Sequence, residues 1–253
     1  MIKSFLNKLG VAFVALTLAF APAVAQQPIV VHGPVAHGPA LIAFVQLNGT
    51  NQYITTPDAS VFDFTQTFAV AALVSRNAWA PSAEAMLVDK SLEGAGNGSW
   101  MVIFQSSNLP LVQAFADGTN AASAGSWNPA PSLTDGQRYW IGFEFDSDNG
   151  SSEREMWTYL GGQGATPSWT LDDNDTRSGE YTIFNSTAQV AIGADSNGSQ
   201  RFWAGKIYKM WFYSDNLSGI PVAIFDAADC SGSTCTTGSI TWTLQNSPTL
   251  GAD

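Results

Sequence analysis

The stretch RYWIGFEFD, from Arg138 to Asp146, decides the fold class because its side chains alternate between two faces. One face receives the apolar set Tyr139, Ile141, Phe143 and Phe145. The opposite face receives Trp140, Gly142, Glu144 and Asp146. This alternation predicts a strand that packs its phenylalanines on a core and turns Trp140 and Glu144 outward.

The residues that follow, SDNGSSE, predict a β-hairpin. Asn149-Gly150 is a dipeptide that accepts the positive backbone angles of a tight turn, and the charged flanks keep the tip wet. The run EMWTYLG (155–161) then reads as the returning strand.

The same pattern of short apolar runs separated by Gly, Asn, Asp, Ser and Pro extends over the chain from Phe44. Besides 138–146 and 155–161, strands are expected at 43–47, 52–56, 67–75, 85–90, 100–105, 111–117, 189–195, 206–214 and 240–245. One short helix is expected over SGIPVAIFDAAD (218–229). The sequence therefore predicts an all-β sandwich with at most one short helix, and no doubly wound fold.

The N-terminus is expected to be an export signal. Lys3 and Lys8 precede an apolar run that closes with the small-residue site Ala23-Val24-Ala25, so residues 1–25 read as a signal peptide cleaved after Ala25. No segment is long and apolar enough to predict a transmembrane span. Residues 26–42, with two His-Gly-Pro units, read as a linker, and 43–253 as the folded domain. A secreted or cell-surface location follows.

Net charge excludes one class of partner. Removing the signal leaves eight basic against 21 acidic residues. Nucleic-acid binding is not expected, because phosphate contacts need clustered Lys and Arg. In an exported chain, Cys230 and Cys235 in DCSGSTC are expected to form a short-loop disulfide that pins a local turn.

Three stretches resemble one family. FVQLNGTNQYITTPD (44–58), WIGFEFDSDNGSSEREMWTYLGG (140–162) and VAIGADSNGSQRFWAGKIYKMWFYSDNLSG (190–219) are similar to the opening hairpin, a middle hairpin and the closing section of concanavalin-A-like, laminin-G-like jelly rolls. The resemblance implies two antiparallel sheets in a jelly-roll sandwich, with the N- and C-terminal strands adjacent. Members bind sugars or proteins, several through calcium, and a related branch hydrolyses β-glucans.

That hydrolytic branch carries Glu, Asp and Glu on alternate residues of one strand, and Glu144, Asp146 and Asp148 have the same spacing. The third acid here is Asp148, and it abuts the turn, where little would raise its pKa for acid catalysis. We therefore assign no catalytic residue.

Calcium is the one cofactor that the acidic loops predict. An EF-hand starting at Asp146 is rejected, because its sixth and twelfth positions hold Ser151 and Trp157. A looser oxygen cage at Asp146 and Asp148 stays open, and it competes with Asp117 and with the acids of LDDNDT (171–176).

Sugar recognition would use aromatic rings that stack on a pyranose, with carboxylates and amides for its hydroxyls. Trp140 and Glu144 share the outward face. The other candidates are tryptophans of Pro-, Gly- or Ser-rich loops: Trp79, Trp127, Trp169 and Trp203. The candidate ligand-binding set is Trp140, Glu144, Trp127 and Trp203.

The sequence favours an exported, non-catalytic module that binds glycans or a protein surface. A structural or adhesive subunit of an envelope, fibre or virion, which would self-associate, is the alternative from another class. A β-glucan-type glycosidase is the third. The sequence identifies neither the ligand nor the oligomeric state.

Overall fold

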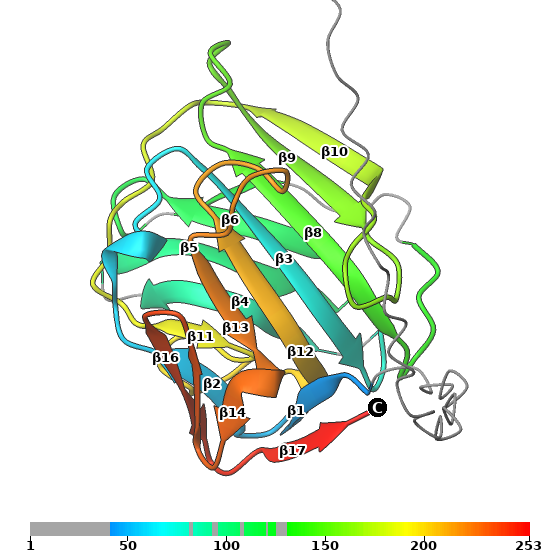
Figure 1. The fold of residues 1–253 in the computed structure, drawn as a ribbon. Helices are drawn as coiled ribbons and strands as arrows, with labels where there is room; N and C mark the ends of the chain where they lie inside the picture. The colour runs from blue at the N-terminus through cyan, green and yellow to red at the C-terminus, as the bar shows by residue number, and fades with distance from the viewer. Residues whose placement is uncertain (1–40, 81–82, 93–95, 107–108, 120, 125–130) are drawn as a thin grey trace, which may run out of the picture. The chain divides into compact units, whose positions relative to one another are not determined.

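The fold is a sandwich of two antiparallel sheets (Figure 1). The computed structural model describes residues 41–253 except 81–82, 93–95, 107–108, 120 and 125–130, and it does not describe the side chains of 121–124. The expected signal peptide (1–25) and the linker up to residue 40 lie outside the described residues.

One sheet has eight strands. Its order is β10 (Thr170–Ser178), β9 (Glu153–Leu160), β8 (Arg138–Asp146), β3 (Thr67–Arg76), β12 (Ala204–Tyr213), β1 (Ala43–Asn48) and β17 (Thr249–Ala252), with β13 (Ala223–Asp226) paired to β12.

The other sheet has nine strands. Its order is β14 (Cys230–Ser231), β15 (Thr234–Thr237), β16 (Ile240–Gln245), β2 (Tyr53–Thr56), β11 (Val190–Ile192), β4 (Ala85–Leu92), β5 (Asn97–Phe104), β6 (Pro110–Phe115) and β7 (Ala121–Ala124). Two single-turn 3₁₀ helices, η1 (Ser60–Phe62) and η2 (Ala227–Asp229), lie outside the sheets. In the described part of the chain, no helix has the length and apolar character of a membrane span.

The alternation in β8 positions the core as expected. Ile141, Phe143 and Phe145 are buried in the main hydrophobic cluster, which takes side chains from both sheets. β3 is buried on both faces, as predicted for its apolar run, because a second cluster covers the side turned away from the core. All eleven predicted strands are present.

The predicted helix at 218–229 is wrong. Its centre forms strand β13, in which Met210 pairs with Phe225 and Trp211 with Ile224, and only the last residues make the η2 turn. Burial alternates along β13, with Ala223 and Phe225 inside. The edge of β12 beyond the end of β1 offers this segment a partner, and strand pairing overrides the local helical pattern.

Strand β10 also lay outside the predictions, because its run of aspartates reads as a turn. It is the edge strand of the eight-stranded sheet, and most of its side chains are exposed. Charged side chains are typical of an exposed edge because they discourage pairing with another chain.

The two ends of the domain meet as the family resemblance implied. β1 lies between β12 and β17, and Ala43 pairs with Ala252. Ile42 and Asp253 exchange backbone hydrogen bonds of 2.8 and 3.1 Å. The C-terminal segment, which the sequence analysis left without a structure, is thus a strand of the sheet.

The hairpin between β8 and β9 is confirmed, with one correction. The Asn149 N–H donates to the carbonyl of Glu153 at 3.0 Å. The positive backbone angles fall on Gly150 (φ 79°) and Ser152 (φ 61°), and not on Asn149. The Asn149 side chain instead accepts the Ser151 N–H and donates to Glu155, both at 2.9 Å.

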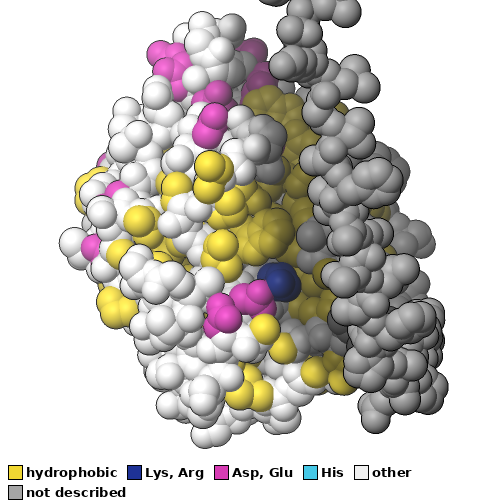
Figure 2. All heavy atoms as spheres, viewed as in Figure 1, with side chains coloured by type: hydrophobic (Ala, Val, Ile, Leu, Met, Phe, Trp, Pro, Cys, Tyr) yellow, Lys and Arg dark blue, Asp and Glu magenta, His cyan; other side chains and the backbone are white. Residues whose placement is uncertain are grey.

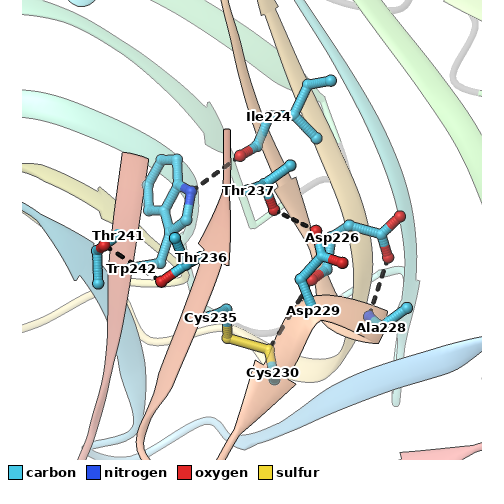
Figure 3. Close-up of a disulfide and its surroundings, with 10 residues drawn as sticks. All are labelled: Ile224, Asp226, Ala228, Asp229, Cys230, Cys235, Thr236, Thr237, Thr241 and Trp242. Carbon is cyan, nitrogen blue, oxygen red and sulfur yellow. Dashed lines mark hydrogen bonds between the residues drawn. A yellow bond between two sulfur atoms is a disulfide. The ribbon is translucent and has the colours of Figure 1, made fainter. Parts of the chain in front are cut away.

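The Cys230–Cys235 disulfide joins β14 to β15, where the two residues are direct cross-strand partners (Figure 3). Beside it, Thr237 donates to the Asp229 carboxylate at 2.6 Å and the Trp242 indole donates to the carbonyl of Ile224 at 2.9 Å. The bond therefore secures a local turn at the end of the nine-stranded sheet, as predicted.

Lys90 on β4 is a fully buried cation. Its ammonium lies 2.8 Å from Asp63 and 3.0 Å from Asp58, and it donates to the carbonyl of Ser186 at 2.5 Å. A buried charge is stable only when its donors are all engaged. Lys90 thus ties two distant loops to the centre of the nine-stranded sheet.

Buried tyrosines predict a loss of stability at alkaline pH. Burial raises the pKa of Tyr213 to about 12, and burial with the nearby Asp253 carboxylate raises that of Tyr208 to about 12. Burial also raises the pKa of Tyr159 and Tyr181 above the ordinary value. The folded-state pKa of each phenol exceeds its unfolded value near 10, so the stabilisation is complete below pH 10 and disappears as the pH rises through about 12.

We expect the free energy of unfolding in urea to fall between pH 10 and 12. Absorbance at 295 nm should show these phenols ionising later in the native than in the urea-unfolded protein. Native and unfolded titration curves that coincide near pH 10 would contradict the prediction. Burial lowers the pKa of Arg76 to about 10, so the contribution of this group to stability rises with pH. One such group offsets only part of the loss from four tyrosines.

Candidate functional site

Trp140 shares a face with Glu144, as predicted, but it is not available to a ligand. Its side chain has no exposed surface. Trp211 and Trp169 lie over it, with ring centroids at 4.6 and 6.1 Å, and its indole donates to the carbonyl of Gly164 at 2.9 Å. The prediction that the Trp140 ring is exposed is therefore wrong, because the loop that contains Gly164 and Trp169 covers this face of β8.

Glu144 is engaged within the protein. One carboxylate oxygen accepts the Leu217 N–H at 2.7 Å, and the other accepts the Tyr159 hydroxyl at 2.8 Å. A side chain at Gly142 would come within 2.5 Å of Leu217, which shows how closely this loop packs on the sheet. Glu144 therefore anchors a covering loop.

Asp146 and Asp148 stabilise the hairpin. Asp146 accepts the Asp148 N–H at 2.9 Å, while Asp148 accepts the Gly150 N–H at 3.0 Å and the Gln66 amide at 3.2 Å. In the described part of the chain, no group of three or more His, Cys, Asp or Glu side chains is arranged to hold a metal ion. Calcium at these two aspartates stays a prediction from the sequence.

Of the loop tryptophans, Trp203 is a core residue. It has no exposed surface, and its indole donates to the carbonyl of Ser75 at 3.1 Å. Trp79 is 2% exposed and packs against it. Trp127 lies outside the described residues. The prediction that Trp203 offers an exposed ring to a ligand is therefore wrong. Trp203 directly precedes strand β12, and its side chain points into the core.

On the outer face of the eight-stranded sheet, apolar side chains from β3, β8 and β12 form a second cluster, and Figure 2 shows apolar patches among polar and charged atoms. Trp169 and Trp211 are half-buried there. Ile220 and Val222, on the segment that leads into β13, are 89% and 37% exposed. The polar groups under this surface, the carboxylate of Glu144 and the indole of Trp140, already have partners. Around Trp169 and Trp211 the face offers apolar contact area, whereas Arg138, Gln163 and Asp253 line a separate polar pocket near Tyr208.

A different arrangement lies on the outer face of the nine-stranded sheet. A pocket of about 280 Å³ opens over β5 and β6. Its floor is apolar and consists of Ile103, Leu111 and Phe115. Polar side chains surround that floor: Gln105, Gln113, Thr119, Glu84 and Arg201. An apolar floor with a few convergent polar groups is the usual composition of a small-molecule site.

Strand alternation builds the floor. Val102, Phe104, Val112 and Ala114 point into the main core, so the residues between them point outward. Ile103 pairs with Leu111 and Met101 with Gln113, which places these outward side chains next to one another. Met86 on β4 pairs with Ile103 and extends the apolar cluster.

Arg201 enters from the loop between β11 and β12. Asp195 holds this loop by accepting the N–H groups of Ser199 and Gln200, both at 2.9 Å. The Arg201 carbonyl accepts the Met86 N–H at 2.8 Å, which fixes the end of the loop to β4. The guanidinium then donates to Glu84 at 3.2 Å, so one ion pair forms part of the rim.

None of these pocket residues is among the candidate binding residues predicted from the sequence. The signal was present in the two runs WMVIFQ and LVQAFAD, where one face is core and the other carries Ile103, Gln105, Gln113 and Phe115. Apolar and amide side chains mixed on an outward face are unusual for a plain solvated sheet. The contributions of Glu84 and Arg201 depend on loops that no local pattern places there.

The pocket chemistry suits binding. Among its described lining residues Glu84 is the single carboxylate, whereas glycoside hydrolysis uses a pair of carboxyl groups flanking the bond. The described lining residues also include no histidine or cysteine. Hydrogen-bond donors and acceptors around an apolar floor can hold a ligand that has both hydroxyls and a C–H face.

No protein-family model matches the chain, and no curated protein matches it. Among solved structures, the CBM40 of the Ruminococcus gnavus IT-sialidase bound to α2,3-sialyllactose aligns at 9% identity and a TM-score of 0.45, covering 70% of this chain and 92% of that one. The botulinum neurotoxin serotype D binding domain aligns at 13% identity and a TM-score of 0.37, covering 71% and 45%. Tailspike protein 2 of Escherichia coli O157:H7 bacteriophage CAB120 aligns at 12% and 0.38, covering 70% and 26%.

Proposed function

We propose that this chain is an exported, non-catalytic module of the laminin-G-like jelly-roll type that binds glycans. Export rests on the signal-like residues 1–25, and the family assignment rests on the three sequence stretches that resemble it. The binding site is the pocket over β5 and β6. Calcium at Asp146 and Asp148 is a separate proposal that the glycan site does not require.

The mixed lining of the pocket carries the proposal. A pyranose has an apolar C–H face, which the floor of Ile103, Leu111 and Phe115 can cover, and a ring of hydroxyls, which amides and a carboxylate can bind. A volume of about 280 Å³ is at the lower end for small-molecule sites. The pocket therefore suits a single sugar unit at the end of a glycan.

A glycan array with a matched pair of variants tests this function. Gln113→Ala should reduce binding to the preferred glycan about five- to thirtyfold, because hydrogen-bonding amides in a pocket each contribute about 1–2 kcal/mol. Gln245→Ala is the control, since Gln245 is a half-buried glutamine on strand β16 of the same sheet and does not line the pocket. Equal binding by both variants, or no bound glycan for the native chain, would contradict the proposal.

A second candidate is a structural or adhesive subunit, favoured by the apolar outer face of the eight-stranded sheet. Trp211 is half-buried on this face, and Ile220 and Val222, on the segment that leads into β13, are 89% and 37% exposed. Large exposed apolar side chains on one face are typical of protein contacts. Oligomers that grow with concentration, from a chain that binds nothing on the array, would support this role over glycan binding.

A further inference from the structure

We propose that the pocket over β5 and β6 selects an electrically neutral sugar unit, and that Glu84 excludes sugars that carry a carboxylate. This inference rests on the proposed glycan-binding function and names its ligand class. It assigns Glu84 and Arg201 to specificity, a role that goes beyond holding the ligand.

The rim of the pocket carries one positive and one negative side chain, Arg201 and Glu84. Arg201 is the one cation among the described residues that line the pocket, and its guanidinium donates to Glu84 at 3.2 Å. Both side chains remain partly exposed, Arg201 by 22% and Glu84 by 45%. A carboxylated sugar approaching Arg201 would meet the negative charge of Glu84 at the same place. The chain as a whole is also acidic, with a net charge of −11, so no wider field favours an anion.

The backbone at Arg201 has an unusual conformation, which is consistent with a role for its side chain. Arg201 has φ 56°, in the left-handed region that non-glycine residues seldom occupy. Such strain persists only where the surroundings enforce it, and here the Arg201 carbonyl is bonded to Met86 and the preceding loop is held by Asp195. A glycine would fit this backbone more easily, so the side chain itself has a use at the rim.

An ion pair at a pocket rim presents donors and an acceptor side by side. The guanidinium provides several N–H groups, and the carboxylate accepts hydrogen bonds. Two neighbouring hydroxyls of a neutral sugar can donate to Glu84 and accept from Arg201 at once, without disturbing the pair. Gln105 and Gln113 add amides that can both donate and accept. Neutral diols are therefore complementary to this rim, whereas a carboxylate could accept from Arg201 and the amides but would be repelled by Glu84.

Glu84→Gln tests this proposal, because it removes the negative charge and keeps the size of the side chain. The probes are matched glycoside pairs that differ only in charge: β-linked glucose and glucuronate, and β-linked galactose and galacturonate. We expect the native chain to bind a neutral member at least tenfold more tightly than its acidic partner. In Glu84→Gln this preference should shift toward the acid by tenfold or more, because the carboxylate that repels the acidic sugar is removed.

Salt and a second variant separate charge from structure. Acid binding by Glu84→Gln should weaken between 0.05 and about 0.5 M NaCl, as expected for a screened ion pair, and neutral-sugar binding by the native chain should not. Arg201→Met should abolish any gain for the acid when combined with Glu84→Gln. Melting temperatures of the variants within a few degrees of native confirm that they fold.

The outcomes are distinct. A native chain that binds the acidic sugars in preference to the neutral ones overturns this inference and leaves glycan binding intact. An unchanged preference in Glu84→Gln also overturns it. A native chain that binds no glycan of either kind overturns the proposed function and this inference together.

Discussion

Trp203→Ala is expected to lower the free energy of unfolding by about 3–5 kcal/mol, the range for deleting a large buried aromatic side chain. Trp203 has no exposed surface and packs against Phe104 and Trp79, with ring centroids at 5.6 and 6.2 Å. Its indole also donates to a buried carbonyl, that of Ser75. The substitution leaves a cavity and removes the indole donor to that carbonyl, and urea unfolding followed by circular dichroism measures the loss.

The neighbouring cation adds to this effect. The Arg76 guanidinium is 2% exposed and stacks over the Trp203 ring at 4.7 Å. Among the described residues, its Nε and Nη1 atoms have no hydrogen-bond partner, and the rings of Trp203 and Phe104 and the charge of Asp135 are its favourable contacts. Trp203→Phe, which keeps a ring in place, should cost clearly less than Trp203→Ala. A loss below about 1 kcal/mol in Trp203→Ala, together with lost glycan binding, would restore the sequence-based hypothesis that Trp203 is a ligand contact.

Lys90→Ala is expected to lower the free energy of unfolding by about 2–5 kcal/mol, because it leaves a cavity at a fully buried position and removes the cation that binds two carboxylates. Lys90 is fully buried between Asp58 and Asp63, and the carbonyl of Ser186 would lose its donor. Equilibrium unfolding in urea at pH 7 measures the change.

Lys209→Ala is the matched control for Lys90. Lys209 makes one ion pair with Asp226 at 2.7 Å, and both side chains are partly exposed, by 23% and 20%. Solvated pairs contribute about 0–1 kcal/mol. Lys90→Met, which restores the buried volume, should recover part of the loss, since Asp58 and Asp63 are 33% and 21% exposed and can turn toward water. Equal losses for Lys90→Ala and Lys209→Ala would show that burial of Lys90 is not what holds these loops.

The candidate site illustrates how far local patterns reach. Sequence reasoning chose Trp140 and Glu144 because they alternate with a core face, and that alternation is correct. It could not show that Leu217 and Trp169, from later loops, cover both residues. Being on an outward face is a property of the strand, whereas being exposed depends on every other segment that packs there.

By itself, the sequence determined eleven of the strands, the hairpin at Asn149-Gly150, the disulfide and the sandwich class, since each of these depends on side-chain period, turn chemistry or spacing within a short segment. Only the tertiary structure decided that 218–229 pairs as a strand, that Trp203 is core, and that Glu84 and Arg201 meet across 117 residues of chain at the rim of a pocket. Those outcomes depend on strand partners and loop contacts between distant segments, and the free energy of such contacts is not encoded in any local run of residues.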